Sequence, residues 1–285
     1  MVETEFPDRN VRYLREELPG LSNARNRGIV EAQGELIAVT DDDVLVDRQW
    51  LAALASAFQQ GDNVACVTGL ILPAELETPA QALLESYGGF SRGYERRLYD
   101  LGQNRPQSVL FPYSAGLFGS GANMAFTRAF LCEINGFDTA LGAGTVARGG
   151  EDLAVFFKAI ASGRQLVYEP GALLYHFHAR EYENLRSQMY CYGVGLVAYI
   201  LKIMVDEPWR IIPIGIRLPA AALHIFSPKS RKNIGKDDQY PRELTRLERI
   251  GMLHGPFLFL RSLRQSGRGR YRQLCSADED ELGAK

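Results

Sequence analysis

The chain has 285 residues, of which 46% are hydrophobic and 23% are charged. This composition is typical of a globular protein with a substantial core, and it excludes a disordered or collagen-like chain. The 32 basic and 34 acidic side chains leave a net charge of −2, which argues against a protein that coats nucleic acid. The polar first residues predict no secretory signal, and four cysteines without CxxC spacing favour reduced thiols. We therefore predict a cytoplasmic location.

Apolar segments and turn residues alternate through the first 180 residues. The predicted elements, in chain order, are strand 10–14, helix 23–33 with Ser22 as its N-cap, strand 35–40, helix 47–61, strand 64–72, helix 80–100, strand 124–126, helix 151–161, and strands 165–168 and 173–177. Such alternation predicts an α/β sheet covered by helices, with ligands at the carboxyl ends of strands. We expect an α/β domain over residues 1–180 and a helical, partly basic segment over residues 181–285.

Three consecutive aspartates, Asp41, Asp42 and Asp43, follow the predicted strand 35–40. Their carboxylates repel one another unless a cation or solvent neutralises them. Carboxylate oxygens are hard ligands suited to Mg²⁺ or Mn²⁺, which also bind the oxygens of a diphosphate. The alternative is a polar turn that caps the next helix, and the triplet alone does not decide between the two.

Two acidic residues, Glu151 and Asp152, begin the predicted helix 151–161 directly after two glycines. The helix dipole favours acids in the first turn, which explains the pair without any function. The functional alternative is a carboxylate base aimed into a cleft, where the glycines allow a substrate to approach.

Two of the four histidines lie close together in the segment Tyr175-His176-Phe177-His178. On a strand, His176 and His178 point to the same face. Histidine is a suitable additional ligand for Mn²⁺ beside carboxylates. Without the other motifs, a pair of ordinary hydrogen-bonded imidazoles is the simpler explanation.

Taken in chain order, these motifs resemble glycosyltransferase family 2. The segments that carry the resemblance are LSNARNRG at 21–28, VTDDD at 39–43, GANMAF at 121–126, GFD at 136–138, GED at 150–152 and HFH at 176–178. It covers residues 9–180 and extends more loosely through 193–195. The aspartate triplet alone is a weak signal, but the ordered set is specific. The resemblance implies the GT-A fold, with a mixed sheet flanked by helices, and transfer of a sugar from a nucleotide-diphosphate donor with inversion at the anomeric carbon.

The resemblance also implies roles for individual residues. Asp43 corresponds to a ligand of a divalent Mn²⁺ or Mg²⁺ ion, Asp41 would lie near the ribose or share the metal, and His176 would be a further ligand, although His178 could take this part instead. Asp152, with Glu151 beside it, matches the general base that deprotonates the acceptor hydroxyl. The expected donor-binding residues are Asp41, Asp42, Arg25, Asn26, Gly121 and Asn123.

The implied partners are a nucleotide-sugar donor and a glycan or lipid-linked acceptor, in cell-surface polysaccharide or glycolipid synthesis. The alternative is a non-catalytic glycosyltransferase-like subunit, or a gene fragment, that binds a partner. A nucleotidyltransferase is disfavoured because no basic phosphate-gripping loop lies near the amino terminus. The joint presence of Asp41, Asp43 and Asp152 favours the enzyme. The sugar, nucleotide base, acceptor and linkage are not determined, because substrate choice lies in variable loops.

The sequence departs from the family at its amino terminus. Only twenty residues precede the segment 21–28, where the family normally has two strands and two helices. A parallel sheet without its central strands would expose an apolar edge. We therefore expect an N-terminally truncated domain, which a late start codon, a gene fragment or completion by a partner would explain.

The segment after Arg180 is predicted to be helical. Residues 209–226 are apolar but contain Pro213 and Pro219, and the stretch 229–272 holds twelve basic and four acidic residues. Apolar faces beside basic residues favour a helix lying on an anionic membrane, which would place the protein peripherally on its inner face. The alternative is a helical cap over the cleft whose basic face is merely solvated.

Overall fold

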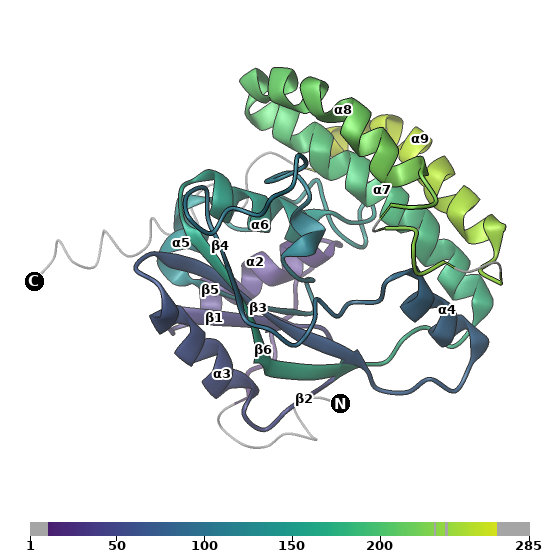
Figure 1. Cartoon of the computed structure of the whole chain (residues 1–285). Coiled ribbons are helices and arrows are strands. Elements are labelled where there is room, and N and C mark those ends of the chain that lie inside the picture. The colour runs from purple at the N-terminus through teal and green to yellow at the C-terminus, as the bar shows by residue number, and fades with distance from the viewer. Residues whose placement is uncertain (1–10, 231, 237–238, 267–285) are drawn as a thin grey trace, which may run out of the picture.

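A mixed sheet forms the centre of the molecule in the computed structural model, which describes residues 11–230, 232–236 and 239–266 (Figure 1). The strands are β1 (Leu36–Thr40), β2 (Val44–Val46), β3 (Val64–Pro73), β4 (Arg97–Tyr99), β5 (Asn123–Thr127) and β6 (Gln165–His176). Their order is β1-β5-β3-β6-β2, and β4 pairs with β6 beside this path. Strands β3 and β6 are parallel and the other pairs are antiparallel. This confirms the predicted mixed α/β sheet.

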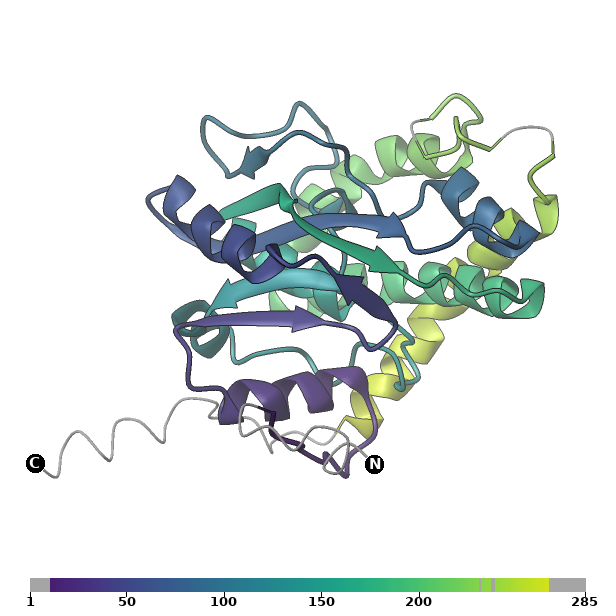
Figure 2. The same cartoon turned by 90° about the horizontal axis from the view of Figure 1, so that it is seen from below.

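Helices cover the sheet and extend beyond it. They are α2 (Leu21–Glu31), α3 (Trp50–Ala57), α4 (Pro79–Tyr87), α5 (Arg128–Glu133), α6 (Glu151–Ala161), α7 (Tyr182–Asp206), α8 (Ile211–Phe226) and α9 (Arg242–Gln265), with the short 3-10 helices η1 (Phe58–Gln60), η2 (Ala115–Leu117) and η3 (Pro208–Arg210). In Figure 2, α2 runs alongside β1, and Ile29 and Ile37 of these two elements share one buried cluster. The mixed sheet, its helices and the C-terminal helical segment agree with the expected fold class.

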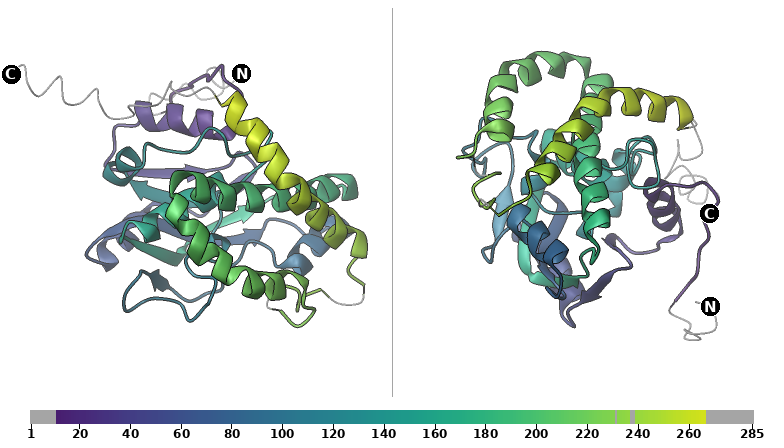
Figure 3. Two further views of the ribbon diagram at one scale, coloured as in Figure 1. Left: turned by 90° about the horizontal axis from the view of Figure 1, so that it is seen from above. Right: turned by 90° about the vertical axis from the view of Figure 1, so that its right-hand side faces the viewer.

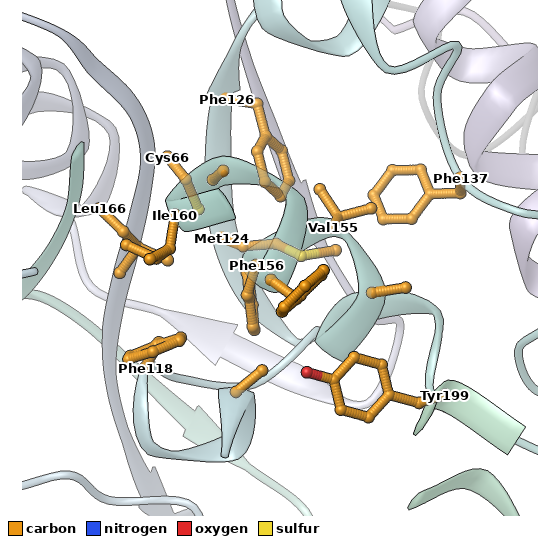
Figure 4. Close-up of a cluster of buried hydrophobic side chains, with 14 of the residues drawn as sticks. Cys66, Phe118, Met124, Phe126, Phe137, Val155, Phe156, Ile160, Leu166 and Tyr199 are labelled. Atoms are coloured by element: carbon orange, nitrogen blue, oxygen red, sulfur yellow. The ribbon is translucent and has the colours of Figure 1, made fainter. Parts of the chain in front are cut away.

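The largest buried cluster lies between β5 and α6. The ring of Phe126 on β5 lies 6.4 Å from Phe156 on α6, 6.2 Å from Phe130 and 6.0 Å from Phe137, measured between centroids (Figure 4). All four rings are almost fully buried. The β-strand preference of Phe126 and the apolar face of α6 thus place both elements against the same core.

The C-terminal helices share this core. Tyr199 of α7 is fully buried, and its hydroxyl donates to the Tyr113 carbonyl oxygen at 3.1 Å. Ile214 of α8 and Phe259 of α9 belong to the same cluster. Figure 3 shows the three helices gathered on one side of the sheet, with α9 crossing α7. The helical segment therefore packs on the α/β body through a continuous apolar core.

Several predicted boundaries are wrong. Residues 11–14 form no strand, and residue 10 lies outside the described residues. The helix predicted over 80–100 ends at Tyr87, because Gly88 and Gly89 have φ of 131° and 50° and turn the chain. The two strands predicted at 165–168 and 173–177 form one strand, β6, with an irregularity opposite Gly69.

Two local interpretations of single residues also fail. Ser22 is not an N-cap, because α2 begins after Gly20 and the buried Ser22 hydroxyl donates to the Leu141 carbonyl oxygen at 2.9 Å. Cys66 and Cys191 are free thiols, whereas Cys132 is disulfide-bonded, so the prediction of reduced thiols is wrong at Cys132. Part of the predicted basic stretch, at 231, 237–238 and 267–272, lies outside the described residues.

Candidate active site

The carboxyl end of β1 leads directly into the three aspartates. The Thr40 hydroxyl donates to the Ala122 carbonyl oxygen at 2.8 Å and holds this end of β1 against the start of β5. Asp41 accepts a hydrogen bond from Arg25, whereas Asp42 and Asp43 are exposed, with 52% of the Asp43 side chain accessible. The triplet therefore does not act as one cluster, because Asp41 and Asp43 have different partners.

Arg25 of α2 connects the two acidic segments. Its side chain is only 6% exposed, and Nη2 lies 3.0 Å from Asp41 Oδ1 while Nη1 lies 3.1 Å from Glu151 Oε1. Nη2 also donates to the Gly121 carbonyl oxygen at 3.1 Å. A planar guanidinium can hold several acceptors in fixed directions. Arg25 thus fixes the end of β1 relative to the start of α6.

The two acidic residues at the start of α6 differ in their surroundings. Glu151 is buried, and its pKa is raised to about 7 by burial and by the neighbouring Asp152 charge, against the lowering effect of Arg25. Asp152 is partly exposed, and its Oδ2 accepts the backbone N–H of Gly121 at 2.9 Å. Asp152 is therefore the carboxylate of this pair that a substrate can reach.

Gly150 sets the direction of the first turn of α6. It is the N-cap with φ of 88°, and a Cβ at this position would lie 2.6 Å from the carbonyl oxygen of Gly195. Both the backbone conformation and this contact with α7 exclude a larger residue without rearrangement.

The pairing of β2 with β6 brings Asp43 and His176 together. Val44 lies opposite His176 in the register, and the backbone N–H of Phe177 donates to the Asp43 carbonyl oxygen at 2.9 Å. As a result, His176 Nε2 is 3.4 Å from Asp43 Oδ1. The sequence motifs place both residues at the site, but the three-residue strand β2 is what joins them.

A chain of contacts extends from this pair into the protein. His176 Nδ1 lies 3.1 Å from His178 Nδ1, and the Nε2 of the buried His178 lies 2.8 Å from Glu85 Oε1. The two imidazoles thus lie on one face, as strand alternation predicts. Phe90 packs against both rings, with centroids 5.0 and 5.6 Å away.

The hydrogen-bonding chain assigns a tautomer to His176. When Nε2–H of His178 donates to Glu85 and Nδ1 of His178 accepts, His176 donates from Nδ1. In that arrangement Nε2 of His176 is open to a cation on the side of Asp43. Burial lowers the pKa of His176, opposed by the Asp43 charge, so the neutral imidazole is favoured.

An imidazole nitrogen and a carboxylate oxygen that face each other at 3.4 Å leave room for a cation bound by both. Asp43 and His176 are an oxygen and an imidazole ligand of the kinds that bind Mn²⁺, and Mg²⁺ binds through a carboxylate such as Asp43. Asp41 is bound to Arg25, and the described residues contain no group of three or more His, Cys, Asp or Glu side chains arranged to hold a metal. The residues therefore fit an ion that takes its remaining ligands from a diphosphate and from water.

The Asp41 charge links the two halves of the site. It contributes to the raised pKa of Glu151, and it opposes the lowered pKa of His176. The described residues thus surround one site, with Asp43 and His176 on one side and Asp152 on the other, and Asp41 between them.

Two predicted donor-binding residues are committed to the fold instead. The Asn26 side chain donates to the carbonyl oxygen of Phe137 and accepts its N–H, both at 2.8 Å. Asn123 is fully buried, donates to the carbonyl oxygens of Leu70 and Ala172, and accepts from the indole of Trp50. These amides hold loops and strands in place.

The sequence motifs miss Glu85 and Arg92. Arg92 is an internal guanidinium whose Nε donates to the Gly116 carbonyl oxygen at 2.7 Å, and burial lowers its pKa, opposed in part by the Asp152 charge. Within the described part of the chain, no carboxylate forms an ion pair with it. The only sequence signal near Arg92 is the glycine pair 88–89, which turns the chain back toward the site.

A separate cavity of about 1140 Å³ lies beside α2 and the ends of α7 and α9. Asn26, Asp138 and Lys202 are among its lining residues, whereas Asp43 and Asp152 are not. The candidate active site is therefore a different surface from this cavity.

Comparison with known proteins shows a partial match to one family. Residues 2–119, less than half of the chain, match the model for glycosyl transferase family 2. The match begins at residue 2, so it does not support the expectation of a truncated domain.

The chain is similar to two curated proteins over part of their length. It is 24% identical over 174 residues to the pre-mycofactocin glycosyltransferase of Mycobacterium tuberculosis, covering 61% of this chain and 33% of that protein. It is 23% identical over 147 residues to the glucosyl-dolichyl phosphate glucuronosyltransferase of Haloferax volcanii, covering 50% and 42%. The chain thus spans less than half the length of either relative.

Among solved structures, the chain is similar to a mannosyltransferase from Pyrobaculum calidifontis in complex with GDP-Man and Mn²⁺. The identity is 16% and the TM-score is 0.43, with 96% of this chain and 63% of that chain covered.

Proposed function

We propose that this protein is a metal-dependent, inverting glycosyltransferase that moves a sugar from a nucleotide-diphosphate donor to an acceptor hydroxyl. The observation that carries the proposal is the 3.4 Å approach of Asp43 Oδ1 to His176 Nε2, in a site that also holds the accessible Asp152 carboxylate. The match of residues 2–119 to the model for glycosyl transferase family 2 supports the reaction class.

Different residues of the site would bind the metal ion and accept the proton. Asp43 and His176 would hold a divalent ion, Mn²⁺ or Mg²⁺, which would supply positive charge to stabilise the leaving diphosphate. Asp152 accepts the proton of the acceptor hydroxyl as its oxygen forms the new bond to the anomeric carbon and the bond to the diphosphate breaks. Arg25 and the Gly121 N–H hold Asp41 and Asp152 in position. Attack from the face opposite the leaving group inverts the configuration.

A lipid-linked acceptor suits this proposal best. The Haloferax volcanii relative is named for action on glucosyl-dolichyl phosphate, which is a lipid-linked sugar. The proposed reaction therefore belongs to cell-surface polysaccharide or glycolipid synthesis.

A thermal-shift titration with UDP, GDP and dTDP, each with and without Mn²⁺, tests the proposal. We expect one nucleotide to raise the melting temperature only when Mn²⁺ is present, because binding to the folded state stabilises it. Asp43→Asn should abolish this shift, whereas Asp62→Asn, an exposed aspartate outside the site, should retain it. A cooperative melt without any nucleotide response would contradict the proposal and favour a non-catalytic subunit.

A further inference from the structure

Helix α8 presents an apolar face to solvent. Ile212, Ile216, Leu223 and Phe226 are 70%, 73%, 68% and 57% exposed, and their spacing places them on one side of the helix. Only Ile214 of α8 is buried. A helix that merely capped the body would bury its largest apolar side chains, whereas α8 exposes them.

The polar groups of α8 are directed away from that face. Arg217 Nε donates to the Val109 carbonyl oxygen at 2.9 Å and Nη1 to the Pro213 carbonyl oxygen at 2.8 Å. Its guanidinium also lies 5.5 Å from the ring centroid of Tyr113 in the body. The charge of Arg217 therefore faces the protein, and the outward side of α8 carries no charged side chain.

Helix α9 also carries exposed apolar side chains and contacts the end of α8. The Arg249 guanidinium lies 4.9 Å from the ring centroid of Phe226, which joins α9 to the end of α8. Leu253, Phe257 and Leu260 follow Arg249 on the same side of α9 and are 78%, 71% and 55% exposed. We define the α8–α9 face as the exposed apolar residues Ile212, Ile216, Leu223, Phe226, Leu253, Phe257 and Leu260.

Basic residues border the α8–α9 face. Arg261 and Arg264 are exposed at the end of α9, and Lys229 is exposed after the end of α8. Both acidic residues of α9 are paired, Glu243 with Arg186 at 2.7 Å and Glu248 with Lys232. Among the described residues, the border of this face is therefore positively charged.

The geometry favours a helix in the membrane plane over a span. Two helices, α7 and the segment Pro208–Phe226, are long and apolar enough to cross a membrane by length and composition. The 19 residues of Pro208–Phe226 reach about 28 Å, close to a hydrocarbon core of about 30 Å, so length does not decide between the two. A span is disfavoured because the buried Ile214 and the hydrogen bond from Arg217 to the Val109 carbonyl oxygen attach the inner side of α8 to the body. In the apolar stretch of α7, 39% of the residues are buried inside the protein, compared with 6% in the stretch within Pro208–Phe226.

We propose that the α8–α9 face docks in the interface of a bilayer that contains anionic lipids. The apolar side chains would enter the headgroup boundary, and Arg261, Arg264 and Lys229 would pair with lipid phosphates. A second copy of the chain is a poorer occupant, because a symmetric contact would bring the same basic borders together. This inference does not depend on the sugar-transfer reaction.

Flotation with vesicles tests the docking. The protein should float with vesicles of equal parts phosphatidylcholine and phosphatidylglycerol, and less with phosphatidylcholine alone or at high salt. The double variant Ile212→Ser/Ile216→Ser should lower the bound fraction by ~10-fold or more, because it removes two apolar anchors. Leu51→Ser, a 62% exposed residue of α3, is the matched control and should bind as the unmodified protein does.

A charge variant separates the electrostatic contribution to vesicle binding from the contribution of the apolar side chains. Arg261→Gln/Arg264→Gln should reduce the preference for anionic vesicles and its salt dependence, with an unchanged melting temperature. All variants should keep the Mn²⁺-dependent nucleotide shift, so that a failure of docking is distinguishable from a failure of the proposed function.

Three results would overturn the proposal. The first is equal flotation of the double variant and the unmodified protein, or no flotation of either. The second is an oligomer in light scattering that the double variant lacks, which would make a second copy the occupant. The third is resistance to extraction by alkaline carbonate, which would indicate a spanning protein.

Discussion

Arg25 illustrates how a single side chain organises this site. The sequence places it in the SNARNRG segment, which the family resemblance assigns to the nucleotide side. In the structure it bonds Asp41, Glu151 and the Gly121 carbonyl oxygen at once. A buried guanidinium with two carboxylate partners holds them against their mutual repulsion. Its role is therefore to keep the acidic residues of the two motifs in a fixed arrangement.

Replacement of the accessible carboxylate should affect chemistry more than binding. Asp152→Asn keeps the shape and the hydrogen bond from Gly121 N–H but removes the proton acceptor, so kcat should fall by ~10²–10⁴. Donor affinity, measured by titration calorimetry with Mn²⁺, should be unchanged. Turnover close to that of the unmodified protein would remove Asp152 from the role of base.

The raised pKa of Glu151, at about 7, predicts a pH-dependent stability. Its ordinary value is 4.5, so between these values the folded state binds more protons at Glu151 than the unfolded state does. The Glu151 contribution to the free energy of unfolding should therefore fall as the pH rises through this window, and level off above it.

Urea unfolding of Glu151→Gln measures that contribution. The stability lost between about pH 5 and about pH 8 should be smaller in Glu151→Gln than in the unmodified protein, by on the order of 1–3 kcal/mol. Identical pH dependence in the two proteins would contradict the assignment.

Other residues of the site could not be predicted from the sequence. Glu85 and Arg92 belong to no motif. Glu85 contacts the buried His178, and the pKa of Arg92 responds to the Asp152 charge. Asn26 and Asn123 stand in motifs, yet their amides are used by the backbone. A motif gives the position of a residue in the chain, but the partners of its side chain depend on segments far away in sequence.

At the level of elements, long periodic segments were predictable and short ones were not. The strand 35–40 and the helix 151–161 are found close to their predicted limits, because apolar pattern and flanking glycines agree. Strand β2 has only three residues and no periodicity, although it aligns Asp43 with His176. The helix predicted over 80–100 was too long, since a glycine pair ended it.

Glycines allow α7 and α9 to pack closely. A Cβ at Gly251 would lie 2.2 Å from the Tyr190 carbonyl oxygen, and a Cβ at Gly193 would lie 1.9 Å from the Glu248 carbonyl oxygen. Because these contacts are with backbone atoms, a side chain there must push the helices apart. The crossing of the two helices therefore depends on the absence of side chains.

Substitution at this crossing should destabilise the protein. Gly251→Ala should lower the free energy of unfolding by about 1–3 kcal/mol through overpacking. Gly215→Ala on α8 is the matched control, because no atom lies within 4 Å of its Cβ position, and it should be neutral or stabilise by up to about 1 kcal/mol. Urea denaturation of both variants measures the difference, and equal effects would refute the packing argument.

For the molecule as a whole, the body and the C-terminal helices share one core. Phe259 of α9 is 1% exposed and belongs to the same cluster as Phe126 of the sheet. The expected boundary near residue 180 therefore divides the sequence without dividing the buried cluster. A shared core predicts that the two parts unfold together.

Scanning calorimetry tests this coupling. The unmodified protein should show one transition, and Phe259→Ala should lower its midpoint as a whole, with a loss of about 3–5 kcal/mol of stability. If the helices formed an independent unit, Phe259→Ala would split the transition and leave one part at its original temperature.

The short ladder between β2 and β6 also has a consequence for the speed of ligand capture. Asp43 and His176 are held together by backbone hydrogen bonds, and the His178–Glu85 contacts fix the ring of His176. The conformational entropy lost in bringing Asp43 and His176 together is thus incurred during folding. If these two residues bind a metal-loaded nucleotide, as proposed, its association should require little reorganisation of the protein and should be limited by the rate of encounter.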